Sequence, residues 1–456
     1  MQDMIAQRQQ LAKWRDDQER RRRTQMYLDF YHNRVRHHLL PLLQEMVDGE
    51  EARELARYLE HDNITQRMVE AISLVFAEPV RVRVRRRGED GFEEDDALQQ
   101  RLDRLLSEAR FGLVLKEVER LSKLLFDVAV LPQARGGKLE LDIITGEKAF
   151  VEQSPQNPTR AARFYYQVDP LQNTPQSARV DIYHVWTGEG KFACTVDASG
   201  NPHDVEPLPH IDYQGRLPVV MFRSYLPVDS FWRDAESAIV QKNIAIDMRR
   251  TDLAMAEAYN IPQLLTIGAP ADQELKKGRT FKIDIPRNEL GEAVGEARYL
   301  KPGESLHEQN ELIRERIEQL GLSLGLSRSV ITGQSASSGY ELALAKHEIL
   351  ERNRADREYY RASVAELVRV MMQTASQALG VGFPDDVDIT VDFGEIRFAQ
   401  SDLDKLRTRK EKLQLGLASP VDFVLEDNPD LDREAAMAQL KRIEQENAAF
   451  AGAVAE

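Results

Sequence analysis

Apolar residues recur every three or four positions over long stretches near the start of the chain, which predicts helices. They do so from residue 5 to residue 75, and again from Asp96 to Val130. Between these stretches, Val80–Arg87 alternates valine with arginine at the two-residue period of a strand. From Val130 to Val220, short apolar alternations separated by turn residues predict a series of antiparallel strands. We therefore expect the first half to be an α+β unit.

The second half has fewer, longer elements and is mainly helical. We expect a helix capped by Ser230 and running to Tyr259, then a compact insert over 261–303 with strand-like LLTIG and RTFKIDI segments. The pattern Ser305–Glu308 is a capping box, so a second helix begins there. Leu326–Gly339 is a loop rich in serine and glycine, with Val330 and Ile331 at its middle.

A further capping box, Ser338–Glu341, begins a helix that we expect to continue without interruption to Leu379, before Gly380. At 1.5 Å per residue it would be about 60 Å long, more than a small domain can cover. Its middle, KHEILERNRADREYYR, is strongly polar. Such a helix crosses between domains or packs against neighbouring chains.

The end of the chain adds one strand and a set of helices. We expect the strand over Asp388–Phe398. Gly416 ends the next helix, Pro420 begins a short one at the first helical position, and a last helix runs from about Leu431 to Ala449.

Composition and charge exclude several classes of protein. The 456 residues allow about two to four domains. A net charge of −15 argues against a protein that grips nucleic acid or anionic lipid over its general surface. The single cysteine, Cys194, excludes a disulfide framework and a cysteine-rich metal site. No apolar run reaches the length of a membrane span, and the first residues lack the apolar core of a secretion signal, so we expect no membrane partner.

Short motifs in the sequence give no support for catalysis. Gly321–Gly325 matches the G-x-S-x-G pattern of serine hydrolases, but an amphipathic helix precedes it where that chemistry needs a strand. No P-loop pattern occurs, so an ATPase is not expected. His32, His37 and His38 lie near Glu45 on a predicted helix, and we expect solvated histidines rather than a metal site. We therefore predict no catalytic residue, no metal and no cofactor.

Basic residues are clustered at Arg20–Arg23 and along Arg81–Arg87. They would make only a modest nucleic-acid footprint. Ion pairing with acidic neighbours such as Glu93–Asp96, or with an adjacent subunit, explains them at least as well.

The order of elements from residue 218 to 446 resembles the portal proteins of tailed bacteriophages, the head-to-tail connector rings of the capsid. The resemblance rests on the helix SFWRDAESAIVQKNIAIDMRRTDLAMAEAY, the insert, the returning helix ESLHEQNELIRERIEQLGLSLGL, the loop LSRSVITGQSASSG and the long helix after it. A strand, DITVDFGEIRF, and a helical tail containing GLASPVDF complete the pattern. Over residues 1–217 the chain is only compatible with such a protein.

The resemblance implies an α+β, mainly helical portal fold, assembled as a ring. Its parts would be an N-terminal wing (1–228), a first stem helix (229–260), a clip (261–303), a second stem helix (304–326), a tunnel loop (327–339), a long tunnel helix (340–380), a wing strand (384–399) and a short C-terminal crown (400–456). In the tunnel loop, the residues facing DNA or packing beside it would be Arg328, Ser329, Val330, Ile331, Gln334 and Ser335. In the clip, the docking residues would be Lys276, Lys277, Arg279, Arg287, Asn288 and Glu289.

The resemblance also implies a function and a set of partners. Twelve copies would form a channel at one capsid vertex, in the virion and, during assembly, in the host cytoplasm. Double-stranded DNA would pass through it, and the ring would bind the large terminase subunit, a head-tail adaptor, and the major capsid and scaffolding proteins. Two alternatives remain at this point: a nucleic-acid-processing enzyme, such as a nuclease or helicase component, and a helical scaffold protein unrelated to viruses.

Overall fold

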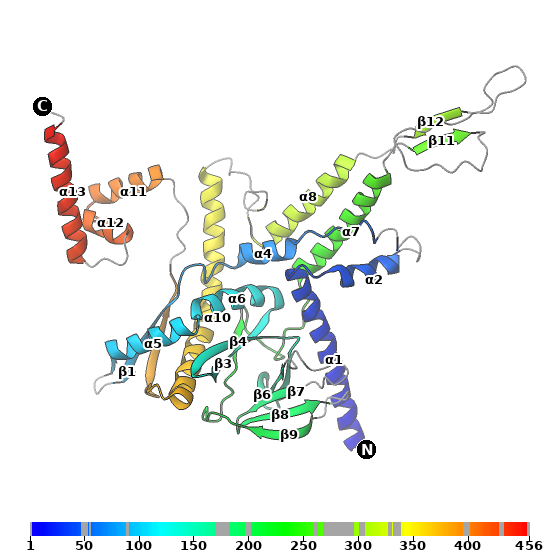
Figure 1. Cartoon of the computed structure of the whole chain (residues 1–456), viewed down its shortest axis with the longest axis horizontal. Coiled ribbons are helices and arrows are strands. Elements are labelled where there is room, and N and C mark those ends of the chain that lie inside the picture. The colour runs from blue at the N-terminus through cyan, green and yellow to red at the C-terminus, as the bar shows by residue number, and fades with distance from the viewer. Residues whose placement is uncertain are drawn as a thin grey trace, which may run out of the picture. The chain divides into compact units, whose positions relative to one another are not determined.

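The computed structural model of the chain describes residues 2–46, 53, 56–87, 91–168, 182–196, 202–259, 263–267, 296–300, 306–326, 331, 339–394, 402–427 and 433–453 (Figure 1). The chain divides into two compact units, Met1–Ile396 and Arg397–Glu456. Helices and antiparallel strands alternate along the first unit, so the α+β class expected from the sequence is confirmed.

Where the sequence pattern indicated one helical region, the described residues at the start of the first unit include several separate helices. Among these are α1 (Gln2–Tyr31), α2 (Arg36–Met46) and α4 (Ile64–Ile72). The first break falls at Asn33, whose φ of 60° is a left-handed conformation that asparagine tolerates. The side chain of Asn63 caps α4 by accepting the Gln66 amide at 3.2 Å. The turn at Asn33 and the cap at Asn63 therefore separate helices within a stretch where the spacing of apolar residues predicted continuous helix.

The helix expected over Asp96–Val130 is two helices and the start of a strand. α5 (Asp96–Glu108) ends at Ala109, and α6 (Phe111–Leu125) begins after Arg110, whose φ is 52°. Phe126, with a φ of 72°, then turns the chain directly into a strand. The prediction of one continuous helix was wrong. Both helices and the strand bury their apolar residues in one core, so the apolar spacing does not reveal the breaks between them.

Every pair of described strands in the first unit is antiparallel. One sheet has the order β13-β1-β2, from β13 (Val387–Asp392), β1 (Arg81–Arg87) and β2 (Phe92–Glu94). A second has the order β10-β3-β4, from β10 (Val220–Arg223), β3 (Asp127–Arg135) and β4 (Lys138–Thr145). The third has five strands in sequence order: β5 (Ala149–Ser154), β6 (Asn157–Val168), β7 (Ile182–Thr187), β8 (Lys191–Val196) and β9 (Pro202–Leu208).

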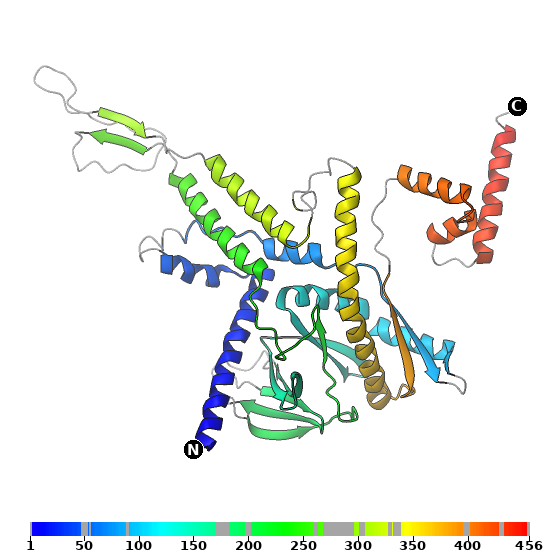
Figure 2. The same ribbon diagram turned by 180° about the vertical axis from the view of Figure 1, so that it is seen from behind.

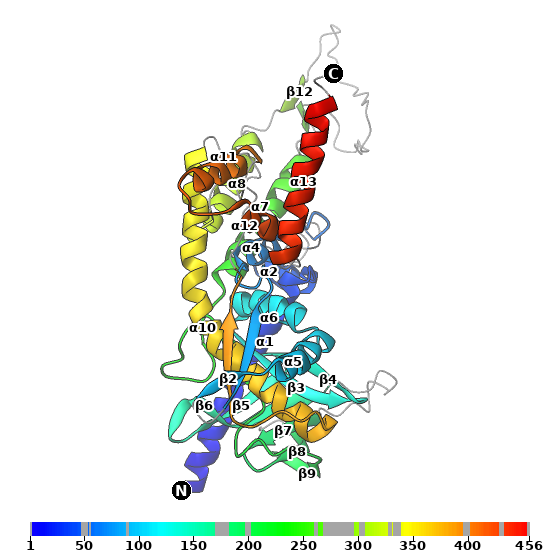
Figure 3. The same cartoon turned by 90° about the vertical axis from the view of Figure 1, so that its left-hand side faces the viewer.

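The strands expected between Val80 and Val220 are confirmed, and two more, β2 and β9, are present. The sequence did not predict β9 because its residues are exposed and follow no apolar alternation. Helix α1 lies alongside the five-stranded sheet (Figures 1 and 3). Arg20 of α1 donates to the carbonyl oxygens of Gly146 and Ala149, at 3.1 and 2.8 Å, which fixes this arrangement.

The core of the first unit lies where α6 and α10 (Gly339–Leu379) meet β3 and β10. Val128, Val130 and Leu131 of β3 are fully buried there, as are Val364, Leu367 and Val368 of α10. The Tyr360 hydroxyl, also buried, lies 2.7 Å from the hydroxyl of Ser122 on α6. The second half of α10 is therefore a core helix of this unit.

The second unit contains α11 (Asp402–Gln414), α12 (Pro420–Asp427) and α13 (Arg433–Ala453). Gly416 follows α11 with a φ of 66°, and Pro420 is the first residue of α12, both as predicted. The leucines Leu406, Leu415 and Leu417 are exposed in the described part of this unit.

Candidate functional site

Two helices and the insert between them form the part of the first unit where the sequence placed stem and clip. Helix α7 (Ala238–Tyr259) contacts α8 (Leu306–Ser323), and both lie apart from the five-stranded sheet (Figure 2). Between them, β11 (Gln263–Ile267) pairs with β12 (Glu296–Leu300), with Gln263 opposite Leu300. The two ends of the insert are therefore held together as a hairpin at the tips of α7 and α8.

The insert agrees with the sequence prediction in part. The strand-like LLTIG segment is β11, whereas β12 was not predicted and RTFKIDI lies outside the described residues. The six predicted docking residues also lie outside the described residues: Lys276, Lys277, Arg279, Arg287, Asn288 and Glu289.

Helix α7 begins at Ala238, seven residues after Phe231, which would be the first residue of a helix capped by Ser230. Ser230 does not cap it; the Ser230 hydroxyl instead donates to the Trp232 carbonyl at 2.6 Å, within a turn. Ser237, immediately before α7, is buried, and its amide donates to the hydroxyl of Tyr27 on α1 at 3.1 Å. Helix α7 is therefore tied at its start to the N-terminal helix.

A row of buried polar side chains then fixes α7 against the segment that leads into α4. Asn243, Asp247 and Thr251 are spaced by four residues, so they share one face of α7, and all three are fully buried. We call these three side chains the polar seam. Asn243 Oδ1 accepts from the amide and hydroxyl of Thr65, at 2.9 and 2.8 Å. Its amide nitrogen donates to the Asp62 carbonyl at 3.1 Å and to Asp247 at 3.0 Å.

Asp247 is the titratable side chain of the seam, and it pairs with His61 from the segment before α4. His61 Nδ1 donates to Asp247 at 2.7 Å, and the Asp62 amide donates to the same carboxylate at 3.2 Å. Burial raises the pKa of Asp247, and the hydrogen bond from His61 opposes that shift. The Glu60 amide donates to Thr251 at 3.3 Å. Sequence reasoning missed this network because its partners are about 186 residues apart.

The predicted tunnel loop, 327–339, is described at Ile331 and at Gly339, the first residue of α10. Ile331 is partly buried and packs against the apolar core, next to α8. A Cβ added at Gly321 of α8 would lie 2.2 Å from Ile331 Cδ1, so only glycine permits this approach. Arg328, Ser329, Val330, Gln334 and Ser335 lie outside the described residues.

The G-x-S-x-G pattern at Gly321–Gly325 is the C-terminus of α8. Ser323 is the last helical residue, and its hydroxyl donates to the Leu320 carbonyl at 2.7 Å. Gly325 follows with a φ of 74°, the left-handed conformation that ends a helix. The pattern thus has two structural reasons for its glycines, and no strand precedes the serine.

Helix α10 is one continuous helix of 41 residues, as predicted (Figure 3). Gly380 follows it with a φ of 68°, and the Val381 amide closes the end by donating to the Ala375 carbonyl at 3.2 Å. Arg354, Glu358 and Arg361 are exposed in its middle turns, whereas the turns from Val364 to Ala375 are mostly buried. The helix is therefore polar at its middle and a core element at its end.

The arginine clusters are paired within the chain. Along β1, alternate arginines pair with aspartates in or next to β13. Arg83 faces Asp392 and Arg85 faces Asp388, whereas the partner of Arg87 is Asp386, the residue before β13. The acidic partners come from β13 and the residue before it, in place of the segment 93–96 that the sequence indicated. In α1, Arg20 pairs with Asp17 at 2.7 Å, and burial lowers the pKa of Arg20 and raises that of Asp17.

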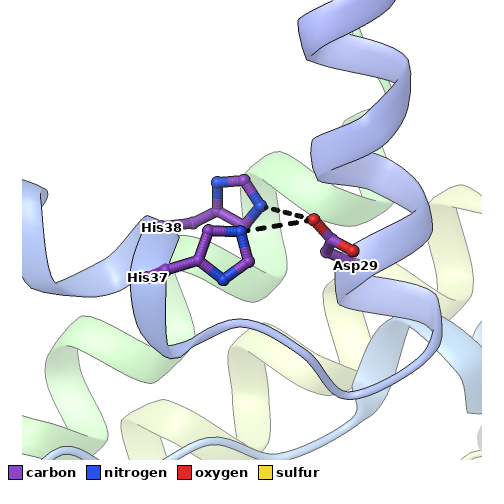
Figure 4. Close-up of side chains that lie close together, drawn as sticks. All are labelled: Asp29, His37 and His38. Carbon is purple, nitrogen blue, oxygen red and sulfur yellow. Dashed lines mark hydrogen bonds and ion pairs between the residues drawn. The ribbon is translucent and has the colours of Figure 1, made fainter. Parts of the chain in front are cut away.

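Two of the three histidines considered from the sequence meet a carboxylate, but it is not Glu45. His37 and His38, in the first turn of α2, both direct Nε2 at Asp29 of α1 (Figure 4). The distances from Asp29 Oδ2 are 3.4 Å for His37 and 2.9 Å for His38. Within the described residues these three form a group of metal-ligating side chains, and His32 is not part of it.

The comparisons with known proteins give no family. No protein-family model matches the sequence, and no curated protein matches it. Solved structures that resemble the chain include the following two. A chain in the virion of a native gene transfer agent particle is 13% identical, with a TM-score of 0.43 over 82% of this chain and 92% of that one. A chain in the neck of an empty gene transfer agent particle is also 13% identical, with a TM-score of 0.39 over 81% and 92%. Scores below 0.5 establish no common fold, so nothing further is concluded from them.

None of the described helices combines the length and apolarity that crossing a membrane requires.

Proposed function

We propose that the chain is a portal protein: a structural subunit, without catalysis, of a ring through which double-stranded DNA enters and leaves a phage-like particle. The observation that carries the proposal is the run of elements from α7 to α10. Two contacting helices bracket an insert closed by β11 and β12, and an unbroken 41-residue helix follows them. This is the order on which the sequence resemblance to portal proteins rests.

The length of α10 supports assembly into a ring. At 1.5 Å per residue the helix is about 60 Å long, and its described side chains are mostly buried only from Tyr360 onwards. The exposed charged residues of its middle turns, such as Arg354 and Glu358, face solvent or a neighbouring chain. A ring of identical head-to-tail contacts supplies a neighbour on each side of every copy.

The charge distribution supports a conduit rather than a protein that holds DNA. Each phosphate that a protein neutralises adds to binding through counterion release, so many such contacts would bind DNA tightly. The net charge is −15, and three of the five arginines of β1, Arg83, Arg85 and Arg87, are paired with aspartates of the same chain. The proposal therefore needs DNA contacts from few residues, such as those of the loop around Ile331.

The proposal includes the finer roles implied by the resemblance. The ring has twelve copies at one capsid vertex of the virion and assembles in the host cytoplasm with capsid and scaffolding proteins. The insert between β11 and β12 is the docking surface for the large terminase subunit and a head-tail adaptor. The polar seam fixes the angle at which α7 carries that insert, because it ties the helix to the segment before α4.

Native mass spectrometry of the purified full-length chain tests the ring directly. We expect particles near twelve times the 52.1 kDa chain mass, and annular particles with a central hole by negative-stain electron microscopy. A monomer or dimer at every salt concentration would overturn the proposal. Cleavage of plasmid DNA by the protein with a divalent metal would favour the enzyme alternative instead.

A packaging assay tests the tunnel loop. Deleting Thr332–Ser337 should leave the ring intact and reduce DNA packaging or retention. The matched control deletes the six residues Leu171–Gln176, between β6 and β7, and should package normally. Equal packaging by both variants would contradict a role for the loop.

A further inference from the structure

We propose that Asp29, His37 and His38 form a binding site for a divalent transition-metal ion of the zinc type. The ligand atoms are Asp29 Oδ2 and the Nε2 atoms of the two histidines, which lie within 4.8 Å of one another. Two imidazoles and a carboxylate are a donor set that zinc and its neighbours in the first transition row accept. Three protein ligands leave at least one position open for water or another ligand.

The distances suit such an ion. With bonds of about 2.0–2.2 Å, two ligand atoms of a tetrahedral zinc site lie about 3.3 Å apart. The separations from Asp29 Oδ2 are 2.9 Å to His38 Nε2 and 3.4 Å to His37 Nε2. Two of the three ligand-to-ligand distances therefore already fit within a few tenths of an ångström. Figure 4 shows both rings directed at the same carboxylate oxygen.

The surroundings hold the carboxylate in position for binding. Its other oxygen, Oδ1, accepts from the Gln25 side chain at 3.0 Å and pairs with Arg34 at 3.2 Å. Both contacts leave Oδ2 directed at the histidines. The hydrogen bond from the neutral Gln25 amide orients the carboxylate, as such bonds commonly do in metal sites, whereas Arg34 adds a positive charge beside it.

Exposure defines how an ion would enter. The Asp29 side chain is 6% exposed and that of His38 is 22% exposed, whereas His37 is 63% exposed. His38 also stacks on the ring of Phe30, with ring centroids 6.3 Å apart, which restrains it. The site is thus anchored on the buried side by Asp29 and His38 and is open to solvent at His37.

Two features of the cluster set its chemistry. The Arg34 guanidinium is a cation beside the carboxylate, so it lowers the affinity for a second cation. Each histidine must also present an unprotonated Nε2 to the ion, so its remaining proton moves to Nδ1.

Isothermal titration of the full-length protein with zinc chloride, at about pH 7.5 where imidazoles are neutral, tests the site. We expect one equivalent per chain. His38→Gln and Asp29→Asn should each weaken binding by about tenfold or more, since removing even a supporting contact costs that much. His37→Gln should weaken zinc binding to the same extent. Because the His37 side chain is exposed, this substitution should leave folding intact. The matched control, His32→Gln, removes a neighbouring histidine outside the cluster and should bind as the wild type does.

Arg34→Gln separates binding from folding. Removing the competing cation should make zinc binding several-fold tighter, a gain that a misfolded variant cannot show. The thermal midpoint should rise with zinc in the wild type and in Arg34→Gln, and stay constant in His37→Gln. Absence of saturable binding by the wild type, or equal binding by wild type and His37→Gln, would overturn the proposal whether or not the chain forms rings.

Discussion

Replacing Asn243 by alanine tests how α7 is held against the rest of the first unit. The side chain is fully buried and makes four hydrogen bonds: two from Thr65, one to the Asp62 carbonyl and one to Asp247. Alanine provides none of them, and it leaves the buried amide and hydroxyl of Thr65 without their acceptor. A buried polar group without a partner costs about 1–3 kcal/mol. The substitution should therefore cost about 3–5 kcal/mol in local stability, because at least two such groups are left unpaired.

Amide hydrogen exchange measures this cost at the position where it arises. Since about 1.4 kcal/mol corresponds to a factor of ten, the Thr65 amide should exchange at least about a hundredfold faster in Asn243→Ala. The amide of Val130 in β3 should be unchanged, because the core around it does not include the seam. Lys242→Ala, an exposed neighbour on the same helix, should leave both amides protected.

Two outcomes would refute the reasoning. If the Thr65 amide stays as protected in Asn243→Ala as in the wild type, the seam does not hold α7. If Val130 loses protection to the same extent as Thr65, the substitution unfolds the whole unit, and the seam is not a separate local contact.

Three further predictions rest on single sites. Gly321→Ala should lower the thermal midpoint, at a cost of about 1–3 kcal/mol for overpacking against Ile331, and in an Ile331→Ala background the same change should be neutral or stabilising. Asp127→Ala should lower the urea midpoint by the equivalent of about 3–5 kcal/mol, because it removes the carboxylate that pairs with the largely buried guanidinium of Arg223. Burial, aided by the charges of Lys191 and Arg135, lowers the pKa of His184 from 6.5 to about 4. As pH falls, the unfolded chain therefore binds a proton at His184 before the folded chain does. The free energy of unfolding should be at its maximum above about pH 6.5 and should decrease as pH falls towards 4. This decrease should be less steep in His184→Gln than in the control His307→Gln.

The sequence predicts the elements whose signals are local. Gly380, Gly416 and Pro420 mark helix ends in the structure as they do in the sequence, because backbone conformation alone makes these residues suited to those positions. The apolar spacing between Asp96 and Val130 misleads, since a helix break at Arg110 leaves the buried face unchanged. A periodic pattern reports which residues are buried, and it does not report whether one element or three bury them.

The candidate sites were harder to predict, for a different physical reason. Glu45 is on the same helix as His37 and His38, so sequence spacing favoured it as their carboxylate. Asp29 reaches them because the left-handed turn at Asn33 folds α2 back towards the end of α1. The asparagine is visible in the sequence, but its conformation depends on how both helices pack. Contacts across a turn need that geometry, and contacts such as His61 with Asp247 need the whole fold.

Helices α7 and α10 of the first unit both bury apolar side chains, and α7 in addition carries the buried polar side chains of the seam, which bears on its motion. The second half of α10 is buried by apolar side chains such as Val364 and Leu367, whose contacts are not directional. Helix α7 is held by the seam, where Asn243 both donates and accepts and Asp247 only accepts. A slip of α7 by one turn would place Asp247 against the Asp62 carbonyl, which also only accepts. A single register of α7 therefore satisfies the seam, so the helix that carries the insert is fixed in position along its axis.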